Sequence, residues 1–254
     1  MRVAVLGARG RMGRETARAV AHDPDMELVA VVDREATAGP IEGLAVSQDP
    51  DAILAAGAEV AVDFTHPAVV MDHARRCLKG GVHFVIGTSG VTPEDLDELR
   101  SLVNGGRANA IVVPNFAIGA VLMMRFAEEA ARHFDAVEVI ELHHDGKADA
   151  PSGTALATAR RVGAARAGSR VTPAGDDRHP GARGADVEGV RVHSIRLPGL
   201  LAHHEVVFGD PGQTLSIRHD STDRSSFMPG VLLAIRAVGS RSGVTVGLEP
   251  LLEA

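Results

Sequence analysis

Near the amino terminus, an apolar strand pattern runs into a glycine-rich turn and then into a helix pattern. Residues Val3 to Leu6 favour a buried strand, Gly7, Gly10 and Gly13 follow at three-residue spacing, and residues 12–22 favour a helix. Glycines in such a turn let the backbone approach a pyrophosphate, which the next helix N-terminus stabilises. The spacing differs from the usual G-x-G-x-x-G, so a plain tight turn is the alternative. The pattern favours a dinucleotide-binding domain built on a parallel sheet.

Up to about Asn115, strand patterns alternate with helix patterns, as an open parallel sheet requires. We expect strands at 3–6, 28–33, 60–64, 84–86 and 111–113, and helices at 12–22, 68–79 and 93–103.

After Asn115 the alternation of strand and helix patterns ends. Pro-Gly turn signals separate the later strands, which is typical of a mixed or antiparallel sheet. We expect helices at 119–133, 153–161 and 229–238, strands at 137–142, 192–196, 205–208, 215–219 and 244–247, and a mobile surface loop at 166–189. The predicted class is α/β: a Rossmann-type dinucleotide-binding domain at 1–116, completed by 225–254, plus an α+β substrate and oligomerisation domain with a mixed sheet at 117–224.

Composition limits the cellular compartment and the classes of binding partner that we expect. Cys77 is the only cysteine, which excludes an internal disulfide framework, and residue 1 leads into a strand rather than a signal peptide. The longest apolar stretches are too short to span a bilayer. A formal charge of −7 argues against nucleic acid. We therefore expect a cytoplasmic protein that binds a small molecule, with neither a nucleic-acid nor a membrane partner.

An acidic residue and three arginines surround the expected nucleotide corner. Asp33 ends the second strand, where a carboxylate would accept hydrogen bonds from the adenosine ribose of NAD. Arg9, Arg11 and Arg34 would suit the 2′-phosphate of NADP, although solvated surface charge is an equally good interpretation of any one of them. Both NADH and NADPH therefore remain open. The cofactor residues expected at this corner are Gly7, Arg9, Gly10, Arg11, Met12, Asp33 and Arg34.

Two further loops follow the third and fourth strands. Phe64 and Thr65 end one strand, and Gly87 and Thr88 end the next. Ligands of open α/β sheets bind at the carboxyl ends of strands, so these loops are candidates for nicotinamide and ribose contacts. His66, before a proline, is interpreted as a loop residue rather than a catalyst.

The segment from 141 to 154 carries the strongest functional signal. It holds His143, His144 and Lys147, and it ends in Ser152-Gly153-Thr154, which opens a helix. The unpaired N–H groups of a helix start attract carboxylate or phosphate. These groups together predict a binding site for a small anion.

A metal site is not expected. Adjacent histidines on a strand point to opposite faces, which disfavours a shared ion for the pair His143 and His144 and for the pair His203 and His204. There is no H-E-x-x-H pattern and no cysteine cluster. His203, His204 and His219 are interpreted as structural or surface histidines.

The chain resembles the 4-hydroxy-tetrahydrodipicolinate reductases, also called dihydrodipicolinate reductases, especially their shorter actinobacterial type. The resemblance rests above all on the His-His-x-x-Lys-x-Asp-x-Pro-Ser-Gly-Thr string at 143–154; Ser89 departs slightly, because the family more often has threonine there. Further matching segments lie at 3–7, 62–67, 87–90, 114–116, 180–184 and 217–221.

The resemblance implies hydride transfer from NADH or NADPH to C4 of a cyclic imine dicarboxylate, with loss of the 4-hydroxyl as water, in diaminopimelate and lysine biosynthesis. It implies that His143 is the acid, with Lys147 also catalytic. The same resemblance adds Pro114, Asn115, Phe116, Arg224 and Phe227 to the cofactor site, Lys147, His144, Ser152, Gly153 and Thr154 to the substrate site, and a homotetramer formed through the second domain's sheet.

Two other functions are compatible with the first domain alone. A homoserine- or semialdehyde-type dehydrogenase would share that domain but would lack the His-His-x-x-Lys string. A redox sensor that binds NAD(P) without turnover would need neither an acid nor a dicarboxylate pocket, so the 143–154 string disfavours it.

Overall fold

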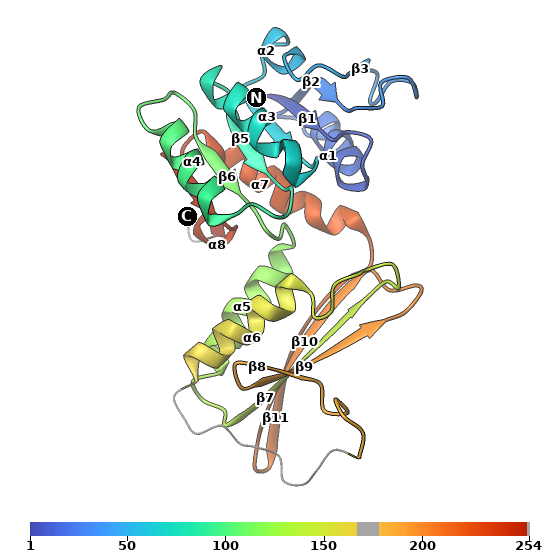
Figure 1. The fold of residues 1–254 in the computed structure, drawn as a ribbon, viewed down its shortest axis with the longest axis vertical. Coiled ribbons are helices and arrows are strands. Elements are labelled where there is room, and N and C mark those ends of the chain that lie inside the picture. Colours follow the sequence, from blue (N-terminus) through green and yellow to red (C-terminus); the bar gives the residue numbers. More distant parts are fainter. Residues whose placement is uncertain (167–177, 253–254) are drawn as a thin grey trace. The chain divides into compact units, whose positions relative to one another are not determined.

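The computed structural model describes residues 1–166 and 178–252 (Figure 1). The chain forms two compact units. Unit 1 consists of Met1–Ile118 with Phe227–Ala254, and unit 2 consists of Gly119–Ser226.

Unit 1 is built on a sheet in which every paired strand is parallel. Its order is β12-β6-β5-β4-β1-β2-β3, so the chain returns at its end to add β12 beside β6. The order runs one way from β1 to β2 and the other way from β1 to β4, which makes the carboxyl ends of β1 and β4 a topological switch point. The strands are β1 (Arg2–Leu6), β2 (Glu27–Val32), β3 (Val46–Ser47), β4 (Val60–Asp63), β5 (His83–Ile86), β6 (Ala110–Val112) and β12 (Val244–Val246).

Helices cover both faces of this sheet, which is why the central residues of β1, β4, β5 and β6 are apolar and buried. On β1, Leu6 belongs to the cluster that contains Leu99 of α4, whereas Val5 packs with Ala17 of α1. In Figure 1, α3 and α4 lie together over part of the sheet. The helices of unit 1 are α1 (Arg11–His22), α2 (Ala52–Ala55), α3 (Pro67–Lys79), α4 (Pro93–Val103), α7 (Met228–Val238) and α8 (Glu249–Leu252).

Unit 2 is a mixed sheet with helices α5 and α6 side by side on one face (Figure 1). Its order is β11-β10-β7-β9-β8; β7 and β9 are parallel and the other neighbours are antiparallel. Val139, Val206 and Phe208 on the covered face pack against Ala127 of α5 and Ala159 of α6. The elements are α5 (Ile118–Ala130), β7 (Ala136–His143), α6 (Gly153–Ala165), β8 (Ala185–Val187), β9 (Val190–Arg196), β10 (Ala202–Asp210), β11 (Gln213–Ser221) and the 3₁₀ turn η1 (Arg224–Phe227).

The predicted fold class is confirmed: a Rossmann-type parallel sheet and a second unit with a mixed sheet. The sequence prediction missed β3, α2, β8 and α8, because elements of two to four residues are too short to show a period. The expectation of a loop at 166–189 is wrong for Ala185–Val187, which pairs with β9; residues 167–177 lie outside the described part of the chain.

Across residues 1–166 and 178–252, the structure contains no helix that is both long and apolar enough to cross a membrane.

Candidate active site

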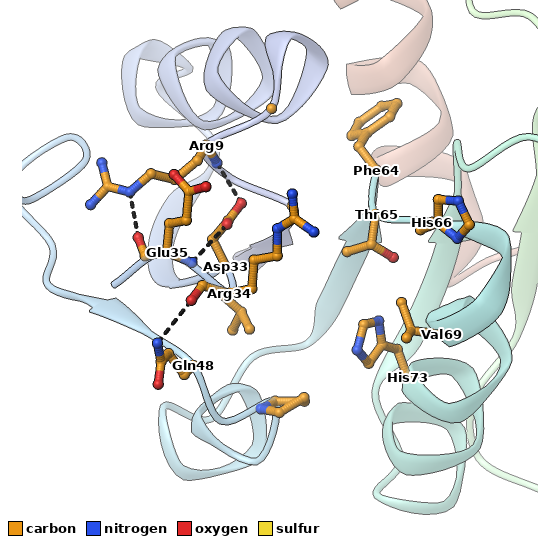
Figure 2. Close-up of a pocket in the computed structure, with 14 residues that line it drawn as sticks. Arg9, Asp33, Arg34, Glu35, Gln48, Phe64, Thr65, His66, Val69 and His73 are labelled. Atoms are coloured by element: carbon orange, nitrogen blue, oxygen red, sulfur yellow. Dashed lines mark hydrogen bonds between the residues drawn. The ribbon is translucent and has the colours of Figure 1, made fainter. Parts of the chain in front are cut away.

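A cavity of about 670 Å³ lies at the switch point of the unit 1 sheet (Figure 2). Its walls come from the loops after β1, β2, β3 and β4 and from the first half of α3. It brings together seven of the residues predicted to bind the cofactor or to lie beside it: Gly7, Arg9, Gly10, Asp33, Arg34, Phe64 and Thr65.

The glycine-rich turn is shaped by close backbone approaches that exclude side chains. Gly7 has φ of +73°, and a Cβ there would lie 2.6 Å from the carbonyl oxygen of Phe64. A Cβ at Gly13 would lie 2.0 Å from the oxygen of Gly7. Gly10 is the N-cap of α1 and provides no side-chain cap, so the first N–H groups of that helix remain available to an anion. These residues fit a dinucleotide pyrophosphate.

Asp33 organises the corner where the adenosine half of a dinucleotide would bind. Its Oδ2 accepts the Arg9 backbone N–H at 2.9 Å, and its Oδ1 accepts the Glu35 N–H at 3.1 Å (Figure 2). The Arg9 guanidinium donates to the carbonyl oxygens of Glu35, at 2.7 Å, and of Gly39. Arg34 instead extends across the cavity toward Thr65. Of the two arginines, Arg34 is therefore the one placed to meet a ligand phosphate.

A buried carboxylate joins the loops after β4 and β5. Asp63, at the end of β4, is fully buried; its Oδ1 accepts from the Thr65 hydroxyl at 2.6 Å and from the Thr88 hydroxyl at 2.8 Å. Its Oδ2 lies 2.7 Å from Nδ1 of His73. A Cβ on Gly87 would meet the rings of Phe64 and Phe116, whose centroids are 5.5 Å apart. The two loops thus form one rigid edge.

Several predicted cofactor residues do not line the cavity. Arg11 and Met12 lie in the first turn of α1, Gly87 and Thr88 follow β5, and residues 114–116 follow β6. Arg224 lies in η1 and belongs to unit 2, whereas Phe227 belongs to unit 1. The cofactor role of these residues stays a prediction.

In unit 2, the end of β7 presents His143 beside a buried carboxylate. Nδ1 of His143 lies 2.5 Å from Oε2 of Glu141, two residues earlier on the same face of the strand. Glu141 has no exposed surface, and Arg196 of β9 donates to both of its oxygens at 2.8 and 3.0 Å. Burial alone would raise the pKa of Glu141, but hydrogen bonds from His143, Arg196 and Ser194 outweigh it and lower that pKa to about 2.

The depressed pKa of Glu141 makes the stability of the fold depend on pH. Its usual value is 4.5, so the stabilisation is fully present above that pH and is lost as pH falls toward about 2. We expect the free energy of unfolding of the wild type to fall more steeply below pH 4.5 than that of Glu141→Gln. Urea titrations at several pH values would measure this difference; equal slopes would contradict it.

The loop from β7 to α6 carries a cation and an open helix start. Nζ of Lys147 lies 2.7 Å from Oδ1 of Asp149, an interaction that lowers the pKa of Asp149. Ser152 is the N-cap of α6: its hydroxyl accepts the Ala155 N–H at 3.2 Å. Gly153 is exposed, and a Cβ there would meet nothing within 4 Å. This helix start is therefore accessible to an anion.

The remaining histidines of unit 2 differ in their surroundings. His144 is half-buried, and its carbonyl accepts the Lys147 N–H at 3.1 Å. His204 is 5% exposed, and its Nε2 has no hydrogen-bond partner among the described residues; burial lowers its pKa to about 4. His203 bonds Asp220 at 2.6 Å. In the part of the chain that the structure describes, no group of three or more His, Cys, Asp or Glu residues could hold a metal ion.

Sequence reasoning assigned no role to Glu141, Arg196 or Asp63. The contact between Glu141 and His143 could have been predicted from their spacing, because alternate strand residues share a face. The contact between Arg196 and Glu141 could not, since only the pairing of β7 with β9 brings these two residues together.

A parallel sheet with a glycine-lined cavity, and a unit that presents histidine, lysine and a helix N-terminus, define a nicotinamide-nucleotide-dependent oxidoreductase. Residues 1–116 match the family model described as dihydrodipicolinate reductase, N-terminus, and residues 119–252 match the model described as dihydrodipicolinate reductase, C-terminus. The chain belongs to the dihydrodipicolinate reductase family.

Individual relatives match along the whole chain. The 4-hydroxy-tetrahydrodipicolinate reductase of Nocardia farcinica is 53% identical, with 100% of this chain and 99% of the relative covered. That of Mycolicibacterium vanbaalenii is 52% identical with the same coverage. A solved structure of dipicolinate-bound dihydrodipicolinate reductase from Paenisporosarcina sp. TG-14 is 42% identical, with a TM-score of 0.88 and 98% of each chain covered.

Proposed function

We propose that this chain reduces 4-hydroxy-tetrahydrodipicolinate to tetrahydrodipicolinate with NADH or NADPH and with loss of water, in diaminopimelate and lysine biosynthesis. The observation that carries the proposal is the single segment 143–154, which combines a carboxylate-bound histidine, a lysine and an open helix start. The full-length similarity to reductases of that name supports it.

The deciding experiment follows NADH and NADPH oxidation by absorbance, with substrate made in situ from pyruvate and aspartate semialdehyde by a purified synthase. We expect oxidation that requires both the synthase product and this chain. No oxidation with either nucleotide would overturn the proposed function.

When bound, NADH or NADPH supplies a hydride. The glycine turn and the N-terminus of α1 would hold its pyrophosphate, Asp33 its adenosine ribose, and the rigid edge after β4 and β5 its nicotinamide half. The residues proposed for the cofactor are Gly7, Arg9, Gly10, Arg11, Met12, Asp33, Arg34, Phe64, Thr65, Gly87, Thr88, Pro114, Asn115, Phe116, Arg224 and Phe227.

Asp33 should set the preference between the two nucleotides. We expect Asp33→Ala to shift the ratio of NADPH to NADH affinity toward NADPH by about fivefold, because the carboxylate would repel a 2′-phosphate. The ratio is the correct readout, since loss of the Arg9 N–H bond weakens both nucleotides alike. Fluorescence titration with each nucleotide measures it.

Arg34→Ala is the matched control and should shift the same ratio toward NADH, because the guanidinium that extends across the cavity is lost. If Asp33→Ala gains no relative NADPH affinity, Asp33 is not the ribose contact.

The substrate's two carboxylates need cationic or N–H partners. We assign them to Lys147, His144 and the helix start at Ser152, Gly153 and Thr154. The dipicolinate-bound relative supports a planar dicarboxylate as the ligand class.

The reaction also needs an acid. The 4-hydroxyl leaves as water with a proton from the neighbouring ring carbon, which gives a conjugated imine. Hydride addition to C4 of that imine leaves an electron-rich enamine, which then takes up a proton at the same neighbouring carbon. His143 is the proposed donor, and Lys147 assists by neutralising the adjacent carboxylate.

We further propose a cytoplasmic homotetramer assembled through the unit 2 sheet, with residues 1–116 and 225–254 binding the nucleotide and residues 117–224 binding the substrate. Light scattering coupled to gel filtration would test the assembly, and a monomer at assay concentration would contradict it.

A further inference from the structure

The Glu141 carboxylate contacts three functional parts of unit 2 at once. Its Oε2 lies 2.5 Å from Nδ1 of His143, and its Oε1 accepts the backbone N–H of Ser152, the N-cap of α6, at 3.3 Å. Arg196 donates to both oxygens. The carboxylate therefore links the end of β7 to the helix start that we assign to the substrate.

The hydrogen bond to His143 defines which ring nitrogen carries a proton. An ionised carboxylate can only accept, so Nδ1 of His143 must be the donor. The pKa of Glu141, near 2, keeps the carboxylate ionised at neutral pH. Nε2 is then the nitrogen left to exchange a proton with a ligand.

The charges around this pair come from every neighbouring strand and from the adjacent loop. Arg196 of β9 faces Glu141, His204 of β10 lies opposite it in register, and His219 of β11 lies opposite His204. Burial lowers the pKa of His204 to about 4 and also lowers that of His219, which disfavours a positive charge on either ring. The loop contributes the internally paired ions Lys147 and Asp149. Glu141 is thus the anion that directly balances a charged His143 ring.

We propose that Glu141 is a positioning residue for His143: it holds a proton on Nδ1, directs Nε2 to donate, and stabilises the imidazolium before transfer. This inference rests on the proposed role of His143 as the acid. In the step, the Nε2–H bond breaks as a C–H bond forms on the substrate enamine, and the ring becomes neutral with its proton on Nδ1. Solvent then reprotonates Nε2.

Glu141→Gln is the informative variant, because an amide cannot accept from both His143 and Arg196. If its oxygen faces the ring, its NH₂ opposes the guanidinium; if its NH₂ faces the ring, Nδ1 cannot carry a proton. We expect kcat to fall by about 10–100-fold, with a smaller change in dipicolinate Kd. The alkaline fall of kcat should also move to lower pH, because the imidazolium loses its counter-charge. A purely structural defect would lower kcat equally at all pH values.

Glu138→Gln is the matched control. Glu138 lies on the same strand and bonds Nε2 of His193 at 2.7 Å, so the variant removes the same kind of carboxylate–histidine bond outside the site. It should keep wild-type kcat and pH profile. The double variant Glu141→Gln with His143→Ala should be no slower than His143→Ala alone, because Glu141 acts through that ring.

If Glu141→Gln does not fold, a measurement on the wild type still tests the inference. Nitrogen NMR of the ¹⁵N-histidine-labelled protein should show neutral His143 with its proton on Nδ1; a proton on Nε2 would overturn the inference. The inference would also be overturned if Glu141→Gln folds and keeps the kcat and pH profile of the wild type while His143→Ala is slow. A wild type without reductase activity, or an active His143→Ala, would instead overturn the proposed function or its acid.

Discussion

Replacing His143 with alanine should lower kcat by about 10²–10⁴-fold, the usual contribution of a positioned general acid. NADH and NADPH affinities should stay nearly unchanged, because the nucleotide cavity is lined by residues of unit 1. Stopped-flow or steady-state oxidation assays give kcat, and fluorescence titration gives the nucleotide Kd. Turnover at the wild-type rate would exclude His143 as the acid.

His133→Ala serves as its control. His133 follows α5, is exposed and faces Glu129 at 4.0 Å, so its loss removes an imidazole of the same unit without touching the site. Its kcat should equal that of the wild type.

Replacing Lys147 with alanine should weaken binding of dipicolinate, pyridine-2,6-dicarboxylate, by about 1.5–3 kcal/mol, or roughly 10–150-fold. The ligand carries both carboxylates of the substrate but cannot accept hydride productively, so it should compete with substrate. Lys147 contacts Asp149 in the absence of ligand, and a bound carboxylate would take over that role. Calorimetry in the presence of nucleotide measures the loss.

Arg160→Ala is the matched charge control for Lys147. Arg160 lies on α6, is exposed and pairs with Glu188 at 3.6 Å, so the variant removes one positive charge near the same helix without removing a proposed ligand contact. Its dipicolinate Kd should remain near the wild-type value. Unchanged binding in Lys147→Ala would mean that the cation lies elsewhere, with His144 the next residue to test.

Much of the fold was predictable because long apolar runs and helix periods are local signals. The strands β1, β4 and β5 are buried on both faces, so each carries an unbroken apolar run, at 3–6, 60–62 and 84–86. Helices α3 and α4 begin with Pro67 and Pro93 at the first helical position. The short strand β3 has no such signal, because two residues gain their structure only by pairing with β2.

The sequence alone determined the chemistry available to this chain: a glycine turn for a pyrophosphate, and a histidine, a lysine and a helix start in one segment. These depend on neighbours in the chain. Tertiary structure alone decided how the groups are held. Arg196 reaches Glu141 only through the parallel pairing of β7 and β9, and Asp63 bonds Thr88 only because β4 and β5 are adjacent. Burial and hydrogen bonding together then set the charge states, since both depend on the atoms packed around a group and not on its place in the chain.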